Sequence, residues 1–168
     1  EAIERVVRRG WFLLGDEVSG FETEYGSYIG TKHCTAVANG LDALRLILKA
    51  YLEMGVMSEG DEVIVPANTY IASILAVTDN RLNPVLGEPD LNSFNIDISL
   101  IERRISSRTK AIMVVHLYGR ACWSDKLTEL ARKYNLKIIE DNAQAAGAIV
   151  PGIIKRTGSL GDSAGHSF

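Results

Sequence analysis

Cysteine is scarce in this sequence of 168 residues, and long apolar runs are missing. Cys34 and Cys122 lie far apart and match no metal-ligand spacing, and so few cysteines favour a reducing compartment over a secreted one. No apolar run approaches the roughly 20 residues that a membrane span needs. No signal peptide is visible, although the chain begins at Glu1 rather than Met and both ends look cut. We therefore expect a cytoplasmic location.

The motifs of several common ligands are missing as well. The formal net charge is -3 and there is no basic stripe, which argues against a nucleic-acid surface. No G-x-G-x-x-G follows a strand and no G-x-x-x-x-G-K-[ST] occurs, so dinucleotide and P-loop sites lose support. No group of His, Cys and Asp has metal spacing, and there is no G-x-S-x-G elbow. The remaining composition, 46% hydrophobic and 23% charged, is that of an ordinary globular domain.

Strand and helix patterns alternate about five times along the chain. Strands are expected at 34–38, 62–65, 83–86, 111–116, 138–141 and 164–168, and helices at 1–9, 18–29, 41–54, 71–79, from about 99, and from 124 to 134. This alternation predicts an α/β fold with a mostly parallel sheet and helices on both faces. The apolar stretch Trp11–Leu14 is expected to pack on the body of the domain.

The stretch Lys137–Gln144 concentrates the chemistry of the chain. Ile138 and Ile139 predict a buried strand, which stops at the carboxylates of Glu140 and Asp141. Ligands of open α/β sheets bind outside the carboxyl ends of the strands, so Asp141 would stand beside a ligand. A buried carboxylate needs a partner, and a cationic ring nitrogen of a cofactor would serve. The alternative is that Asp141 caps a turn or pairs with a nearby Arg.

Other strand ends carry further candidate groups. Asn39-Gly40 stands between a strand and a helix start, which is a ready anion site. Tyr70, Gln144 and His166-Ser167 offer an aromatic face, a polar side chain and a hydroxyl donor. With Asp141, these groups suit a phosphorylated, cationic aromatic ring such as pyridoxal phosphate, which needs a carboxylate beside its ring nitrogen. The alternatives are a plain helix cap, core packing of Tyr70, and packing of His166 within a strand.

Six segments in fixed order strengthen this interpretation. They are Gly60–Tyr70, Phe94–Asp97, Thr109–Ile112, His116–Gly119, Ile139–Gln144, and Gly158–Asp162 with Ser167-Phe168. Together they resemble the N-terminal part of the DegT/DnrJ/StrS family of pyridoxal-phosphate sugar aminotransferases. The resemblance implies the fold-type-I aminotransferase architecture. Residues 1–30 would form an N-terminal segment and 31–168 an incomplete cofactor-binding large domain.

The resemblance also assigns roles to single residues. Asp141 would pair with the pyridinium nitrogen, Gln144 would lie by the ring's phenolic oxygen, Tyr70 would stack on the ring, and Gly40, Leu41 and Ser167 would hold the phosphate. The sequence departs from the family at Asn39-Gly40-Leu41, where Ser-Gly-Thr is usual. Because the Thr hydroxyl is lost, that phosphate contact would fall to backbone groups. Cys122-Trp123-Ser124 departs as well, and no metal is expected.

The resemblance implies a reaction and its partners. An amino acid, expected to be glutamate, would give its amino group to a nucleotide-linked keto-sugar. The branch of the family that acts on dTDP-3-keto-6-deoxyhexoses is the one most similar to this chain at two segments, Asn39–Leu41 and Gly165–Phe168. A homodimer is expected, with the site at its interface. The Schiff-base lysine is expected a few residues beyond Phe168, since Lys155 lies outside the motif, so residues 1–168 alone are expected to be inactive.

Two other functions stay open. One is a sugar dehydratase of the same family, in which histidine replaces the lysine. The other is a non-catalytic chain kept for binding or regulation. The residues that follow Phe168 would separate the first alternative from an aminotransferase, and a test of ketone-dependent amine transfer would separate the second.

Overall fold

One parallel sheet is the centre of the computed structural model, which describes residues 1–168. Its strand order is β2-β1-β3-β4-β5, and every neighbouring pair is parallel. The strands are β1 (Glu62–Pro66), β2 (Asn83–Gly87), β3 (Thr109–Val115), β4 (Lys137–Asp141) and β5 (Ser163–Gly165). The carboxyl ends of all strands therefore meet at one edge of the sheet, with β4 between two neighbours. The predicted α/β fold with a parallel sheet is confirmed.

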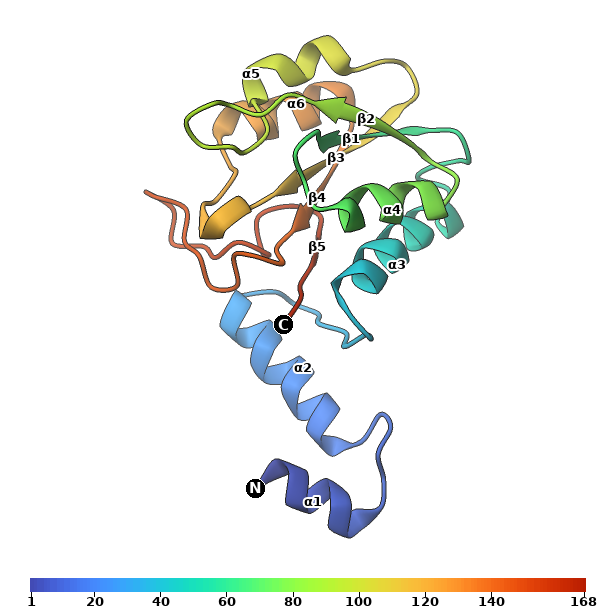
Figure 1. Cartoon of the computed structure of the whole chain (residues 1–168), viewed down its shortest axis with the longest axis vertical. Coiled ribbons are helices and arrows are strands. Elements are labelled where there is room, and N and C mark those ends of the chain that lie inside the picture. The colour runs from blue at the N-terminus through green and yellow to red at the C-terminus, as the bar shows by residue number, and fades with distance from the viewer.

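Helices cover both faces of this sheet (Figure 1). On one face lie α3 (Gly40–Glu53) and α4 (Ile71–Asp79), and on the other α5 (Ile98–Ile101), the short 3-10 helix η1 (Glu102–Arg104) and α6 (Asp125–Tyr134). Another 3-10 turn, η2 (Leu117–Gly119), follows β3. Each face has its own apolar core. None of the helices combines the length and the apolar character that crossing a membrane requires.

Alternation along β4 decides which residues can reach the site. Ile139 packs in the core beneath α3 and α4, whereas Ile138 packs in the core beneath α6. Because successive side chains of a strand point to opposite faces, Asp141 shares the α3 and α4 side with Ile139, and Glu140 shares the other side with Ile138. The two neighbouring carboxylates therefore belong to different layers.

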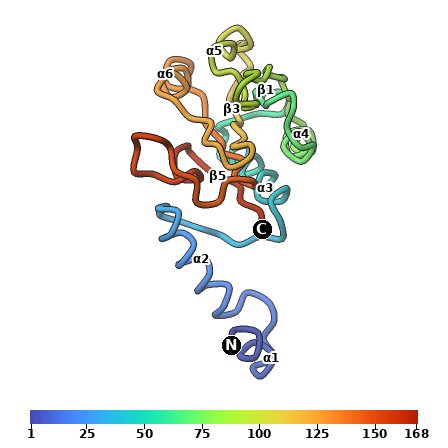
Figure 2. Tube along the Cα trace, turned by 60° about the vertical axis from the view of Figure 1, so that its left-hand side comes forward, coloured from blue at the N-terminus to red at the C-terminus, as the bar shows by residue number.

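Two N-terminal helices, α1 (Ala2–Arg9) and α2 (Asp16–Ile29), project away from the sheet (Figures 1 and 2). The expectation that Trp11–Leu14 packs on the domain is wrong, because these four side chains are 67 to 82% exposed. The stretch joins the two projecting helices, so no layer of the sheet domain lies over it. The C-terminal half of α2 contacts the end of the chain, where the Tyr25 ring lies edge to face with the rings of His166 and Phe168. The domain division at residue 30 stays a prediction.

Two expected strands differ from the structure. Residues 34–38 form no strand. The backbone N–H of Ala36 donates instead to the Glu22 carboxylate at 2.7 Å, so this extended segment bonds to α2 rather than to the sheet. The last strand, β5, ends at Gly165 and not at Phe168. At the start of α5 the Asp97 side chain is the cap, and it accepts a hydrogen bond from the Ser99 N–H at 2.8 Å.

Candidate functional site

Asp141 ends β4 as a nearly buried carboxylate, with 7% of its surface exposed. Its Oδ2 accepts a hydrogen bond from the Ser73 hydroxyl at 2.6 Å, and its Oδ1 accepts one from the Ala143 N–H at 3.2 Å. No Lys, Arg or His side chain of the chain forms an ion pair with it, so the alternative of an Arg partner is wrong. The bond from Ala143 does cap the following turn. A carboxylate can accept about four hydrogen bonds, so Asp141 keeps acceptor capacity for a ligand.

The beginning of α4 lies against Asp141. Ser73 is in the first turn of this helix and is fully buried, while Tyr70 is its N-cap residue. Tyr70 is 75% exposed, which excludes core packing within the chain as the reason for this aromatic residue. Since Ser73 touches Asp141, the start of α4 places Tyr70 on the same side of the sheet as the carboxylate. Stacking of its ring on a cofactor stays a prediction.

The beginning of α3 forms the second part of the site. A Cβ added to Gly40 would lie 2.8 Å from the Ser167 Cβ, so the absence of a side chain lets Ser167 approach the helix. The Asn39 side chain caps the Asp42 N–H, but the N–H groups of Gly40 and Leu41 have no acceptor in the chain. Two free amides beside a serine hydroxyl at a helix start fit a phosphate group.

The two parts are joined through β5 and the turn after β4. Gly165 pairs with Asp141 in the sheet, so Ser167 is only two residues beyond the partner of the carboxylate. Gln144 follows in the turn, where its Oε1 accepts a hydrogen bond from the Tyr118 N–H at 2.8 Å. This bond leaves the two amide protons of Gln144 as donors. Asp141, Ser167 and Gln144 thus lie at one edge of the sheet, although the role of each toward a cofactor stays a prediction.

Glu140 has a different environment on the opposite side of β4. It is fully buried and accepts four hydrogen bonds, from His116 Nε2 at 2.8 Å and from three backbone N–H groups, those of Gly158, Leu160 and Gly161. Burial raises the pKa of Glu140, but these donors outweigh it and hold the pKa below its usual range. The Cys122 N–H donates to His116 Nδ1, which places the ring proton on Nε2. His116 therefore has a structural role.

Sequence reasoning missed this network because it treated Glu140 only as a neighbour of Asp141. The signal that could have found it is the strand period, which turns adjacent residues to opposite faces. It also missed Ser73 and Thr69. Their hydroxyl oxygens lie 2.8 Å apart, and nothing in the sequence pattern of α4 shows that they face a strand end.

The alternative that His166 packs within a strand is wrong, because β5 ends one residue earlier. Its Nδ1 lies 2.8 Å from the Tyr25 hydroxyl and 3.0 Å from Asn142 Nδ2, so α2 is tied to the segment that carries Ser167. Burial lowers the pKa of His166 and raises the pKa of Tyr25 to about 12. Both groups are therefore neutral near pH 7 and serve as a hydrogen-bonded anchor.

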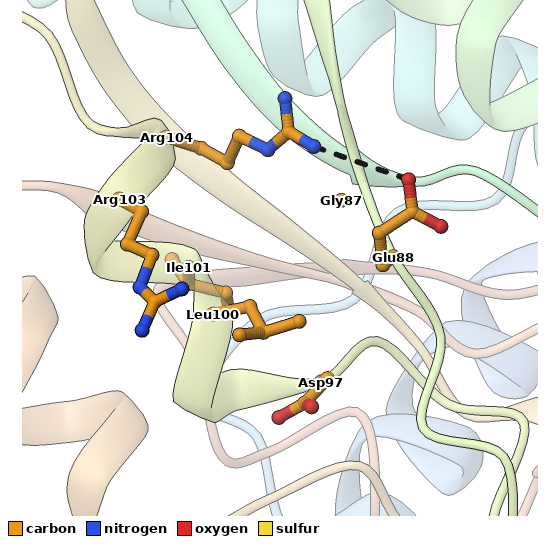
Figure 3. Close-up of a pocket in the computed structure, with 7 residues that line it drawn as sticks. All are labelled: Gly87, Glu88, Asp97, Leu100, Ile101, Arg103 and Arg104. Atoms are coloured by element: carbon orange, nitrogen blue, oxygen red, sulfur yellow. Dashed lines mark ion pairs between the residues drawn. The ribbon is translucent and has the colours of Figure 1, made fainter.

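A separate hollow of about 250 Å³ lies between the end of β2 and α5 (Figure 3). The Arg104 side chain reaches across it toward Glu88, at a distance of 3.9 Å. It is lined by Gly87, Glu88, Asp97, Leu100, Ile101, Arg103 and Arg104. None of the predicted site residues lines it, so it forms no part of the candidate site.

Comparison with known proteins identifies the family. The family model described as the DegT/DnrJ/EryC1/StrS aminotransferase family matches residues 1–168. The chain belongs to this family. The resemblance read from the six sequence segments is thereby confirmed.

Among curated members of the family, the chain is similar to the dTDP-3-amino-3,6-dideoxy-alpha-D-galactopyranose transaminase of Aneurinibacillus thermoaerophilus. The two are 60% identical over 168 residues, which are 100% of this chain and 45% of that relative. The chain thus spans less than half the length of this aminotransferase.

Solved structures of the family share the fold. S. venezuelae DesV, in complex with a ketimine intermediate, matches with a TM-score of 0.86 and 46% identity over 94% of this chain and 41% of that one. The E. coli GDP-4-keto-6-deoxy-D-mannose-3-dehydratase with bound hydrated PLP matches with a TM-score of 0.88 and 28% identity. That match covers 95% of this chain and 41% of the dehydratase chain. These structures confirm the predicted fold type and the predicted cofactor, pyridoxal phosphate, for the family.

Proposed function

We propose that residues 1–168 are the cofactor-binding part of a pyridoxal-phosphate aminotransferase that acts on a nucleotide-linked keto-sugar. The observation that carries this proposal is the Asp141 carboxylate, which is nearly buried and has two neutral donors but no cationic partner in the chain. An isolated buried charge is costly, and a protonated pyridine nitrogen is a cation of suitable size and shape.

The rest of the site fits the same ligand. The N–H groups of Gly40 and Leu41 and the Ser167 hydroxyl would hold the phosphate, since they are the free donors at the start of α3. The exposed Tyr70 ring would cover one face of the cofactor, and the free amide protons of Gln144 would reach the phenolic oxygen. Leu41 would contribute only its backbone, because its side chain packs against the apolar core.

When bound, pyridoxal phosphate supplies an electron sink for bond breaking next to an amine. Asp141 would keep the proton on the ring nitrogen, which keeps that sink strong. Gly40, Leu41 and Ser167 would fix the ring through its phosphate, and Tyr70 would exclude water from one face. The residues of the chain would thus hold, orient and shield the cofactor, and Asp141 would be the one that holds the proton on the ring nitrogen.

The proposed substrate is a dTDP-3-keto-6-deoxyhexose, with glutamate as the amino donor. The relative that is 60% identical is a dTDP-3-amino-3,6-dideoxy-alpha-D-galactopyranose transaminase, which supports this choice. The second candidate is a sugar dehydratase, favoured by the TM-score of 0.88 to the E. coli dehydratase but opposed by the lower identity of 28%. A homodimer and a cytoplasmic location belong to the proposal, and both cysteines are free thiols, which suits a reducing compartment.

The experiment uses the intact protein that contains residues 1–168, loaded with pyridoxal phosphate and given glutamate and the dTDP-linked 3-keto-sugar. We expect equal amounts of 2-oxoglutarate and an aminated sugar nucleotide, detected by mass spectrometry. Loss of water from the sugar without gain of nitrogen would establish the dehydratase instead. Failure to bind the cofactor would contradict both enzymatic functions and favour the non-catalytic alternative.

A further inference from the structure

The hydroxyl groups of Ser73 and Thr69 form a chain that ends on Asp141. Ser73 Oγ lies 2.6 Å from Asp141 Oδ2 and 2.8 Å from Thr69 Oγ1. A carboxylate only accepts hydrogen bonds, so the single Ser73 proton points to Asp141, and the bond between the two hydroxyls must be donated by Thr69. The direction of the chain is thereby fixed as Thr69 to Ser73 to Asp141.

This chain fixes the orientation of the carboxylate. Ser73 has no exposed surface, and a hydrogen bond to a charged group in such a place is strong. It occupies one side of Oδ2, while the weaker bond from Ala143 N–H occupies one side of Oδ1. The carboxylate therefore cannot rotate without breaking its shortest bond, and its free acceptor positions keep one direction.

The chain of hydroxyls also joins two functional elements. Thr69 directly precedes Tyr70, and Ser73 lies in the first turn of the helix that Tyr70 caps. The same bonds thus set the distance between the proposed ring-stacking residue and the carboxylate at the end of β4. A carboxylate that faces the ring edge and an aromatic side chain that covers its face must agree in position to within a fraction of an ångström to act on the same ligand.

We propose that Ser73, oriented by Thr69, is a positioning residue that holds the Asp141 carboxylate toward the cationic ring nitrogen of the cofactor. This inference rests on the proposed function. It predicts that loss of the Ser73 hydroxyl weakens the hold of Asp141 on the ring proton more than it weakens the fold.

The test compares Ser73→Ala, Thr69→Val and Thr69→Ser with a matched control, Ser106→Ala, in the intact protein that contains residues 1–168. Ser106 also donates its hydroxyl to a nearly buried carboxylate, Glu62, at 2.5 Å. Glu62 begins β1, at the opposite edge of the sheet from the site. The control therefore removes the same kind of bond away from the cofactor.

Three quantities are measured for each variant: the rate of amine transfer from glutamate to the bound cofactor, the pH at which the visible absorbance of the bound cofactor changes, and the thermal midpoint. We expect Ser73→Ala to slow the transfer about tenfold, equal to about 1.4 kcal/mol, and to move the spectral change to lower pH. Thr69→Val should slow it about threefold, Thr69→Ser should restore it, and Ser106→Ala should change neither the rate nor the spectrum.

Several results would overturn the inference. The first is that Ser73→Ala and Thr69→Val both leave the rate and the spectral change as in the unmodified protein. The second is that Ser106→Ala alters the rate and the spectral change as much as Ser73→Ala does. If Ser73→Ala does not fold, the pair Thr69→Val and Thr69→Ser decides, and equal rates in these two variants would contradict the role. An unmodified protein that binds no cofactor would refute the proposed function, whereas an active one with silent variants refutes only the role of Ser73.

Discussion

Glu140 and Asp141 are neighbours in one strand, yet their environments are opposite. Glu140 is completely buried and accepts four hydrogen bonds, including one from His116. Asp141 is nearly as buried but accepts only two, from Ser73 and Ala143. The first carboxylate is fully satisfied by the chain, and the second is not.

The difference separates a structural group from a binding group. The donors to Glu140 come from His116, directly after β3, and from the 158–161 turn, so its charge ties these segments to β4. Asp141 keeps acceptor positions at the edge of the sheet where parallel strands place ligands. A buried charge with unused acceptor capacity marks a place for a cation from outside the chain. Burial alone would not distinguish the two residues, whereas the count of their donors does.

The largest effect on stability is expected from Glu140→Gln. Each Glu140 oxygen accepts two of the four hydrogen bonds, and the amide nitrogen of glutamine cannot accept, so two donors would lose their partner. His116 would also no longer face a charged group. We expect the free energy of unfolding to fall by about 3–5 kcal/mol, measured by urea denaturation of the cofactor-free protein. A loss below about 1 kcal/mol would show that the network around Glu140 is not a main support of the fold.

Asp141→Asn should act on catalysis instead. The amide keeps the shape of the side chain but cannot stabilise a cationic ring nitrogen. We expect turnover to fall by at least about 100-fold, equal to about 2.7 kcal/mol, while the free energy of unfolding without cofactor changes little. The measurement is steady-state amine transfer alongside the same urea denaturation. Near-normal turnover would contradict the role of Asp141.

The contribution of Glu140 to the free energy of unfolding should depend on pH. The pKa of Glu140 lies below its usual value of 4.5, so its ionised form stabilises the fold above that pH, and this contribution is lost as the pH falls through the lowered pKa. We expect the gap in unfolding free energy between the unmodified protein and Glu140→Gln to be full at pH 6 and to shrink below about 4.5. A gap that stays constant down to pH 3 would be the contrary result.

A smaller effect is expected where α3 meets Ser167. In Gly40→Ala the new methyl group would come within 2.8 Å of the Ser167 Cβ, so either the serine or the helix start must move. We expect the affinity for pyridoxal phosphate to fall about tenfold, equal to about 1.4 kcal/mol, measured by fluorescence titration. Gly20→Ala is the matched control, because a Cβ at this helical position of α2 meets nothing within 4 Å. Equal affinities for both variants would argue against a phosphate at Gly40.

Much of the fold could be predicted from the sequence because its signals are local. The alternation of apolar periods predicted most strands and helices of the sheet domain, including β3 and α6. Asn39, which could be read as a plain helix cap, does cap α3. Residues 34–38 carry the same local signal as a strand, but the nearest partner of Ala36 is a side chain of α2. The hydrogen-bond partner of such a segment depends on residues far away in the sequence, so the local pattern cannot predict it.

The candidate site was predictable in part for the same reason. Asp141, Tyr70 and Gly40 stand at the ends of predicted elements, where parallel strands collect functional groups. Ser73 has no such mark, since its importance comes from the way the first turn of α4 meets β4. The division of work between Glu140 and Asp141 follows from strand alternation, but the donors that satisfy Glu140 come from a turn about 20 residues later.

The most direct test of the account is the protonation state of the cofactor ring nitrogen, read by NMR of nitrogen-15-labelled pyridoxal phosphate in the intact protein that contains residues 1–168. We predict a protonated nitrogen near pH 8 in the unmodified protein and in Glu140→Gln, and a neutral nitrogen in Asp141→Asn. The same nitrogen shift in the unmodified protein and in Asp141→Asn would contradict the claim that Asp141 is the partner of the ring.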